Sequence, residues 1–199
     1  MAASIGSRGT LHLHSEQEEY LEASTFVPYA PLMTEYPGEP RWLDDDEMRA
    51  WLALNGVILL LPGALDSQMQ RDNGITMFEY LVMAMLSEAP GRTLQLKRLA
   101  SVVNGSLSRL SHVVTRLEKR DWVRRVPAPD NGRITMATLT DEGYSKVVAS
   151  APSHVERVRE VVFDVLDREQ VHQLEDIAER LLGKLNADCV PGLRSAVRG

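Results

Sequence analysis

Apolar residues recur at helical spacing in four segments of this chain. The first pattern runs from about residue 44 to 70, and the second from residue 76 to 88. Two more follow beyond the middle of the chain, from residue 140 to about 166 and from residue 167 to about 186. A side-chain period of 3.6 is typical of amphipathic helices that bury one face. The sequence therefore predicts a mostly α-helical fold.

Local signals mark where these helices begin and bend. Thr76 is suited to an N-cap, and the stretch from Asp167 to Gln170 has the spacing of a capping box. Asp44–Glu47 places four carboxylates at the positive end of the first helix. Successive helical residues do not face one another, so these acids are interpreted as capping groups and not as a catalytic or metal site. Pro62 and Pro152 should bend or interrupt the first and third helices.

The segment between the second and third helices contains two shorter helical patterns joined by a turn. Residues 94–100 predict a short helix, and residues 103–106 predict a tight turn that ends at Ser106 as an N-cap. In the helix that follows, the residues expected to pack inward are Leu107, Leu110, Val114 and Leu117. The polar residues expected to point outward are Ser108, Arg109, His112, Thr115, Arg116 and Lys119. Two helices joined in this way form a helix-turn-helix, whose second helix enters the DNA major groove.

A change of periodicity follows the second of these helices. Residues 122–126 and 134–139 are rich in β-formers, and residues 127–133 between them contain two prolines and a glycine. The pattern predicts a β-hairpin with a long tip, which after a helix-turn-helix is a wing. Arg133 would lie where a wing reaches a minor groove, although an ordinary exposed loop residue is the alternative.

Charge separates this region from the rest of the chain. Residues 90–133 hold 10 Lys and Arg against 3 Asp and Glu, a local net charge of +7 in a chain of net charge −6. The remaining residues therefore sum to −13. A basic segment in an acidic protein indicates a surface that binds a polyanion, and duplex DNA is the first partner to consider. A solvated helix carrying many charges is the alternative.

Several motifs in this segment resemble the winged-helix core of the MarR family of transcriptional regulators. They are Leu99-Ala100, the stretch from Ser106 to His112, the run from Thr115 to Arg125, Asn131-Gly132-Arg133, and Leu139–Gly143. The likeness extends over about residues 42–186. It implies an obligate homodimer whose terminal helices form the dimer domain. It also implies two winged helices that read a palindromic operator, usually as a repressor relieved by a small molecule or an oxidant.

The resemblance and the outward face together give the candidate site residues. In the recognition helix they are Ser106, Ser108, Arg109, Ser111, His112, Thr115, Arg116 and Lys119, and in the wing they are Asp130, Asn131 and Arg133. The wing departs from the family, which commonly has Asp, one residue, then Arg; here Asp130 is displaced by one position. Many members also have Arg where this chain has His112. A histidine is mostly neutral at physiological pH, which favours a base contact over a phosphate contact.

The resemblance also divides the chain. Residues 1–41 form an acidic arm with closely spaced prolines, residues 42–186 the MarR-type domain, and residues 187–199 a C-terminal tail. The winged helix is expected at about residues 74–140, and the dimer helices at about 44–70 and 141–186. In the family, effectors commonly lodge between the dimer helices and the winged-helix lobes. Trp42, Trp51 and Tyr80 are candidates for lining such a crevice, with simple core packing as the alternative.

Other function classes find little support. No phosphate-binding loop, nucleophile elbow or zinc motif is present, so no catalytic residue, metal or cofactor is predicted. The enzyme alternative is a small helical protein that uses His154 or His172 with Glu156 or Glu175; the other alternative is a winged helix that binds protein without reading DNA. His12 and His14 lack a third metal ligand, and Cys189 could only be an exposed thiol. No apolar run approaches 18 residues and no signal peptide begins the chain, so we expect a cytoplasmic protein that does not enter membranes.

Overall fold

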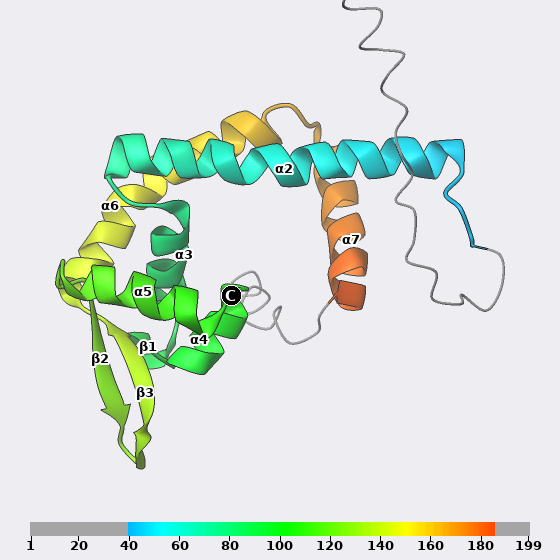
Figure 1. Cartoon of the computed structure of the whole chain (residues 1–199). Helices are drawn as coiled ribbons and strands as arrows, with labels where there is room; N and C mark the ends of the chain where they lie inside the picture. The colour runs from blue at the N-terminus through cyan, green and yellow to red at the C-terminus, as the bar shows by residue number, and fades with distance from the viewer. Residues whose placement is uncertain (1–39, 186–199) are drawn as a thin grey trace, which may run out of the picture. The chain divides into compact units, whose positions relative to one another are not determined.

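The computed structural model describes residues 40–185 of the chain. The chain divides into two compact units, Met1–Asp45 and Asp46–Gly199. Apart from Asp45, the first residue of α2, the second unit contains the elements labelled in Figure 1: α2 (Asp45–Asn73), α3 (Met77–Ser87), β1 (Thr93–Gln95), α4 (Leu96–Val102), α5 (Leu107–Glu118), β2 (Val123–Ala128), β3 (Asn131–Leu139), α6 (Asp141–Val158) and α7 (Arg168–Leu185). A short 3-10 helix (Pro90–Arg92) precedes β1, and a π-helical turn (Arg159–Phe163) follows α6. His12, His14 and Cys189 lie outside the described residues.

The first helix differs from its prediction at the proline. α2 runs as one helix from Asp45 to Asn73 through Pro62, so the interruption that was one of the two expected outcomes is wrong. Pro62 cannot donate to the carbonyl of Ile58, but Ile58 is exposed and water can hydrate that group. α6 likewise continues through Pro152, and its departure from α-helical hydrogen bonding comes later, at Arg159–Phe163.

The capping signals in the sequence are confirmed. Thr76 caps α3 in a capping box: its hydroxyl oxygen accepts from the backbone N–H of Glu79, whose carboxylate accepts from the backbone N–H of Thr76. Asp167 and Gln170 form the same reciprocal pair before α7, with both bonds at 2.9 Å. Thr140 caps α6, its hydroxyl oxygen accepting from the backbone N–H of Gly143. These pairs satisfy N–H groups that a helix leaves free at its start.

The core lies inside the winged helix, where α3, α4, α5 and the base of the sheet meet. Its fully buried members include Val82, Met83, Leu86, Leu99, Leu110, Val114 and Leu117. Leu107 is 53% exposed, so the expectation that it packs inward is wrong, and Val113 is buried instead. At 100° per residue Leu107 falls on the edge of the arc formed by the buried residues of α5, and it lies in the first turn of the helix.

The sheet is antiparallel with the strand order β1-β3-β2 (Figure 1). β1 pairs with β3 through Leu94 opposite Ala137, which corrects the expectation that Leu94 and Gln95 begin a helix. In the wing, β2 and β3 pair as far as Ala128 opposite Asn131. The tip is thus the turn Pro129-Asp130 and not a seven-residue loop, because a register shift at Pro127/Ala128 lets the strands continue past the proline.

The terminal helices keep their apolar faces uncovered in the single chain. Leu59 and Leu60 of α2 are 77% and 75% exposed, and no residue of α7 is buried. Other exposed apolar residues are Trp51, Leu52, Val57, Ile58, Leu174, Ile177, Leu181 and Leu185. The prediction that these faces lack cover within their own domain is therefore confirmed for the described residues.

α2 also corrects the expectation about apolar length. An 18-residue window of this helix reaches a mean hydropathy of 1.5 and is not buried, so by length and composition it could cross a membrane. Asn55 and the glycines interrupt the apolar residues of this helix, so a search for a continuous apolar run of 18 residues does not find it. One such helix is weak evidence for a span, because a helix covered by a second protein surface has the same composition.

Candidate nucleic-acid interface

The turn before α5 has the backbone that the sequence predicts. Asn104 adopts the left-handed conformation with φ 48°. Space is limited at Gly105, because a Cβ there would lie 2.9 Å from Cζ of Phe78 and the ring would have to shift. Ser106 then caps α5, because its hydroxyl oxygen accepts from the backbone N–H of Arg109 at 3.1 Å. The turn and cap fix where α5 begins against α3.

The outward face of α5 carries the polar residues expected there. The exposed members are Ser106, Ser108, Arg109, His112, Thr115, Arg116 and Lys119, and Ser111 is half-buried. Such side chains donate hydrogen bonds to base edges and phosphates. The exposed face of the helix and the buried face opposite it agree with the sequence prediction in every position except Leu107.

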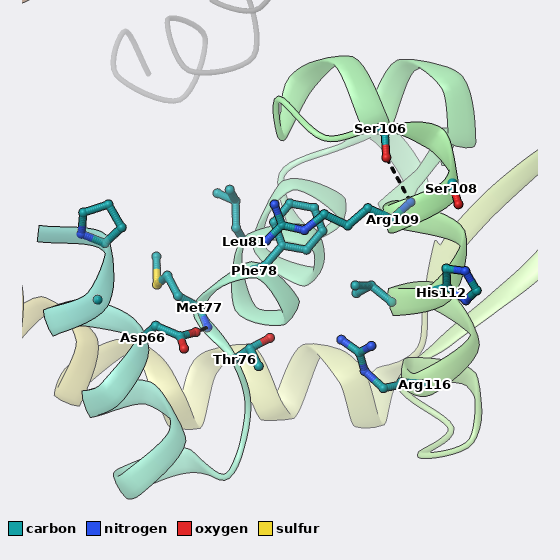
Figure 2. A pocket seen from close by; sticks show the side chains of 13 residues that line it. Asp66, Thr76, Met77, Phe78, Leu81, Ser106, Ser108, Arg109, His112 and Arg116 are labelled. Atoms are coloured by element: carbon teal, nitrogen blue, oxygen red, sulfur yellow. Dashed lines mark hydrogen bonds between the residues drawn. The ribbon is translucent and has the colours of Figure 1, made fainter. Parts of the chain in front are cut away.

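Two arginines of this face are held by residues of α3. The guanidinium of Arg109 lies over the ring of Phe78, 4.1 Å from its centroid (Figure 2). Nε of Arg116 donates to Oε1 of Glu79 at 2.9 Å. Because that bond uses Nε alone, the two terminal nitrogens of Arg116 remain available as donors.

Glu79 is buried and satisfied. Its Oε2 accepts from the backbone N–H and the hydroxyl of Thr76 at 2.9 and 3.1 Å. Burial acts to raise the pKa of Glu79, but the hydrogen bonds from Thr76 and the nearby Arg116 outweigh it, and the pKa lies below the usual range of a glutamate. This carboxylate therefore stays charged at neutral pH and anchors Arg116 to the start of α3.

A cavity of about 860 Å³ opens beside the two arginines. It lies between the second half of α2, the start of α3 and the outer face of α5 (Figure 2). Apolar side chains of Met77, Phe78 and Leu81 form one part of its lining. The other part is polar: Asp66, Thr76, Ser106, Ser108, Arg109, His112 and Arg116. The carboxylate of Asp66 is hydrogen-bonded there, since its Oδ1 accepts from the backbone N–H of Met77 at 2.7 Å.

The tip of the wing is held by an asparagine. Oδ1 of Asn131 accepts from the backbone N–H of Arg133 at 3.1 Å. Among residues 40–185, neither the guanidinium of Arg133 nor the carboxylate of Asp130 has an ion-pair partner. The structure therefore gives no sign that Asp130 orients Arg133 in this chain, and Asn131 braces the turn in its place.

The three aromatic residues proposed for an effector crevice do not line this cavity. Tyr80 is buried in the core and its ring lies 4.9 Å from that of His154. Trp51 is half exposed on α2, and Trp42 is 80% exposed in the other compact unit. Tyr80 thus packs in the core, which was the alternative to lining a crevice, and its burial raises its pKa.

The histidines considered for catalysis do not form a site. His154 packs against Tyr80 in α6, and burial lowers its pKa. His172 is exposed on α7. Within residues 40–185 no group of three His, Cys, Asp or Glu side chains is placed to hold a metal ion.

Several residues that position the interface were missed in the sequence. Glu79 and Phe78 hold the arginines of α5, and Arg125 of β2 reaches back to the same helix. Arg120 donates to the carbonyl of Gly74 at 3.2 Å and stands 4.9 Å from the ring centroid of Trp122. Of these residues, Glu79 had a local signal in the sequence, because it lies three positions after the N-cap residue Thr76. The other contacts join residues far apart in the chain, which spacing alone does not reveal.

A helix-turn-helix with a two-stranded wing and a basic outer face defines a winged-helix protein of the DNA-binding kind. The MarR family model matches residues 75–135. The chain is 41% identical to Sco3205 of Streptomyces coelicolor, a MarR family transcriptional regulator solved in complex with DNA, with a TM-score of 0.70 over 75% of this chain and 94% of that one. AbsC, a MarR family regulator of the same organism, is 36% identical with a TM-score of 0.65 over 73% and 100%. The regulator PecS of Dickeya dadantii is 27% identical over 77% of this chain and 89% of its own length.

The chain belongs to the MarR family of transcriptional regulators. Family membership confirms the fold predicted from the sequence, with its mostly helical composition and small antiparallel wing. It also confirms that the protein is a regulator and not an enzyme.

Proposed function

We propose that this regulator is a cytoplasmic repressor of transcription. It binds a palindromic duplex-DNA operator as a homodimer. The observation that carries the proposal is the outer face of α5, where Ser108, Arg109 and His112 are exposed together. A B-DNA major groove is about 12 Å wide and admits one α-helix. Sco3205, which is 41% identical, was solved in complex with DNA, and this likeness supports the same use of α5 here.

The site roles follow from position on the interface. Ser106, Ser108, Arg109 and His112 lie in the first half of α5, which in a helix-turn-helix contacts base edges. We assign Ser111, which is half-buried, and Thr115, Arg116 and Lys119 toward the end of α5 to the phosphates and to the support of this helix. In the wing, Arg133 would enter the adjacent minor groove, with Asn131 bracing its backbone. We assign no DNA contact to Asp130, because no cation of the described chain neutralises it.

A second copy of the chain is the cover we propose for the terminal helices. α2 and α7 expose long apolar faces, and a groove of about 810 Å³ lies between α2, the π-helical turn and α7. It is lined almost wholly by apolar side chains such as Val57, Leu60, Val165 and Ile177. Two-fold pairing through residues 44–70 and 141–186 would bury these faces and set the spacing of two recognition helices.

The cavity beside α5 favours control by a small molecule. Its lining combines an aromatic and aliphatic part with the cations Arg109 and Arg116, as in sites that bury an apolar ligand and orient it by a few polar groups. A ligand in this cavity would contact the side chain of Arg109, which is also the side chain proposed to contact DNA. Gly63 lines the opposite wall, and a Cβ there meets nothing within 4 Å. Gly63→Leu should therefore occupy part of the cavity without a clash at its Cβ.

The test begins with genomic DNA. Purified protein should recover fragments that share an inverted repeat, and sedimentation should show a dimer at the concentrations used. Fluorescence anisotropy on one fragment and its scrambled form should give an affinity that is tighter for the fragment by at least about 10³-fold. Recovery of fragments with no common sequence, or a monomer with full affinity, would contradict the proposal.

The same assay tests the effector site. A library of small organic molecules is screened for release of the labelled fragment, and hits are repeated with Gly63→Leu. Release from the wild type but not from Gly63→Leu, at equal DNA affinity, would support the cavity as the effector site. Equal release from both proteins would place the effector elsewhere.

A further inference from the structure

One side chain at the base of the wing contacts α5 at three positions between Ser111 and Glu118. Arg125 lies on β2, and its Nη2 donates to the carbonyl of Ser111 at 2.7 Å and to the hydroxyl of Thr115 at 3.1 Å. Its Nη1 donates to the carboxylate of Glu118, and its backbone N–H donates to the other oxygen of the same carboxylate at 3.0 Å. Ser111 also presents its hydroxyl to Nη2 at 3.3 Å.

These acceptors share one line along the helix. Residues separated by four and then three positions, as Ser111, Thr115 and Glu118 are, stack on one helical face. A planar guanidinium can bind two separate acceptors at once, which an ammonium group cannot do with the same geometry. The side chains of Arg125 and Glu118 are 26% and 31% exposed, so the pair is partly shielded from water. It is therefore better protected from screening by salt than an exposed ion pair.

Arg125 also holds the hairpin close to the point where it leaves the core. The buried residues of the hairpin are Val123 on β2 and Ala137 and Leu139 on β3, all at its base. Arg125 pairs with Ala137 across the ladder. From Val126 to Met136 no residue is buried, so the direction of the tip depends strongly on the backbone pairing of β2 with β3 and on this clamp.

We propose that Arg125 is a positioning residue that sets the angle between the wing and the recognition helix. The inference rests on the proposed function, in which α5 and Arg133 bind adjacent grooves at the same time. Two groove contacts are simultaneous only if the two elements that make them keep a constant relative orientation. Ser111 and Thr115 then support DNA binding by holding the clamp, because their acceptors are used by Arg125.

The first test measures hydrogen exchange of the full-length protein without DNA. In Arg125→Ala, backbone amides of residues 126–136 should exchange faster by roughly tenfold, while those of α3 keep their wild-type protection. Arg124→Ala is the matched control, since Arg124 is an exposed arginine on the same strand and points to the other face. Arg125→Gln keeps much of the side-chain stem and serves if the alanine variant does not fold. Unchanged exchange of residues 126–136 would overturn the proposal.

The second test asks whether the clamp acts through Arg133. On a fragment recovered from genomic DNA, Arg125→Ala should weaken binding by roughly 5- to 100-fold, and adding Arg133→Ala should cost little more. Arg124→Ala and Arg133→Ala should instead combine multiplicatively. Multiplicative losses for Arg125 and Arg133 would overturn positioning through Arg133. If Arg133→Ala alone binds like the wild type, the proposed reading by the wing is wrong, while the exchange experiment still decides whether Arg125 holds the hairpin.

Discussion

Replacing Gly143 with alanine should force the first turn of α6 away from the base of the wing. A Cβ at this position would lie 2.1 Å from the carbonyl oxygen of Trp122 and 2.7 Å from Cδ1 of Leu139. Ordinary C···O contacts begin at roughly 3.3 Å, so the helix must move by about 1 Å. The same carbonyl accepts from the backbone N–H and the hydroxyl of Thr140 at 3.0 and 3.2 Å, and these bonds would weaken with the shift.

The expected loss follows from these contacts. Overpacking costs about 1–3 kcal/mol, and each weakened hydrogen bond adds about 0.5–1.5 kcal/mol. Alanine returns up to about 1 kcal/mol through its higher helix propensity. With two weakened bonds, the free energy of unfolding should therefore fall by about 1–6 kcal/mol, which corresponds to a Tm lower by about 2–24 °C for a chain of this size.

Thermal unfolding followed by circular dichroism, at one protein concentration throughout, measures this effect. Gly183→Ala is the matched control, because it also lies in a helix and its Cβ would meet nothing within 4 Å. The control should keep or slightly raise Tm. A Gly143→Ala protein as stable as the wild type would refute the close contact between α6 and the wing.

Three further predictions concern the interface and the dimer. Because the pKa of Glu79 is lowered in the fold, its charge stabilises the protein above its unfolded pKa of about 4.5, and this stability is lost as pH falls through the lower folded value. Glu79→Gln should therefore lower Tm at pH 7, and the difference from the wild type should shrink below pH 4.5; a pH-independent difference would count against the ionised pair with Arg116. Arg133→Ala should weaken operator binding by about 1–3 kcal/mol and reduce the log–log salt slope by about one, while Asp130→Ala leaves affinity equal or slightly better; weaker binding of Asp130→Ala would mean that this carboxylate does orient the arginine. Truncation before Asp167 removes α7 and should give monomer or aggregate without tight DNA binding, whereas a stable truncated monomer with full affinity would exclude α7 from the dimer domain.

Local sequence was sufficient where one short segment contains all the interacting groups. The N-cap at Thr76 and the capping box at Asp167 use donors and acceptors three residues apart, so both could be predicted from the sequence. The buried and exposed faces of α5 follow from a single period for the same reason. Leu107 was misplaced because periodicity does not say how far the core extends along the first turn.

Contacts between segments that are far apart in the chain could not be predicted from the sequence. Glu79 and Arg116 are 37 positions apart, and Arg125 of β2 contacts Ser111 of α5, which lies 14 positions earlier in the chain. Both contacts depend on how α3, α5 and the wing pack, which is determined by the whole core. The length of the wing tip was also missed, since Pro127 suggested the end of a strand, but a register shift lets β2 continue to Ala128.

The most direct test of base recognition by α5 measures the affinities of the wild type and of one variant for two DNA fragments. Anisotropy titrations of the wild type and His112→Ala are made on a recovered operator fragment and on its scrambled form, at two salt concentrations. His112 is exposed on the outer face of α5, and its loss should leave the fold intact. We expect affinity for the operator to fall by about 1–3 kcal/mol, with affinity for scrambled DNA and both salt slopes nearly unchanged. Equal losses on both DNAs, or no loss on either, would contradict the reading of bases by this helix.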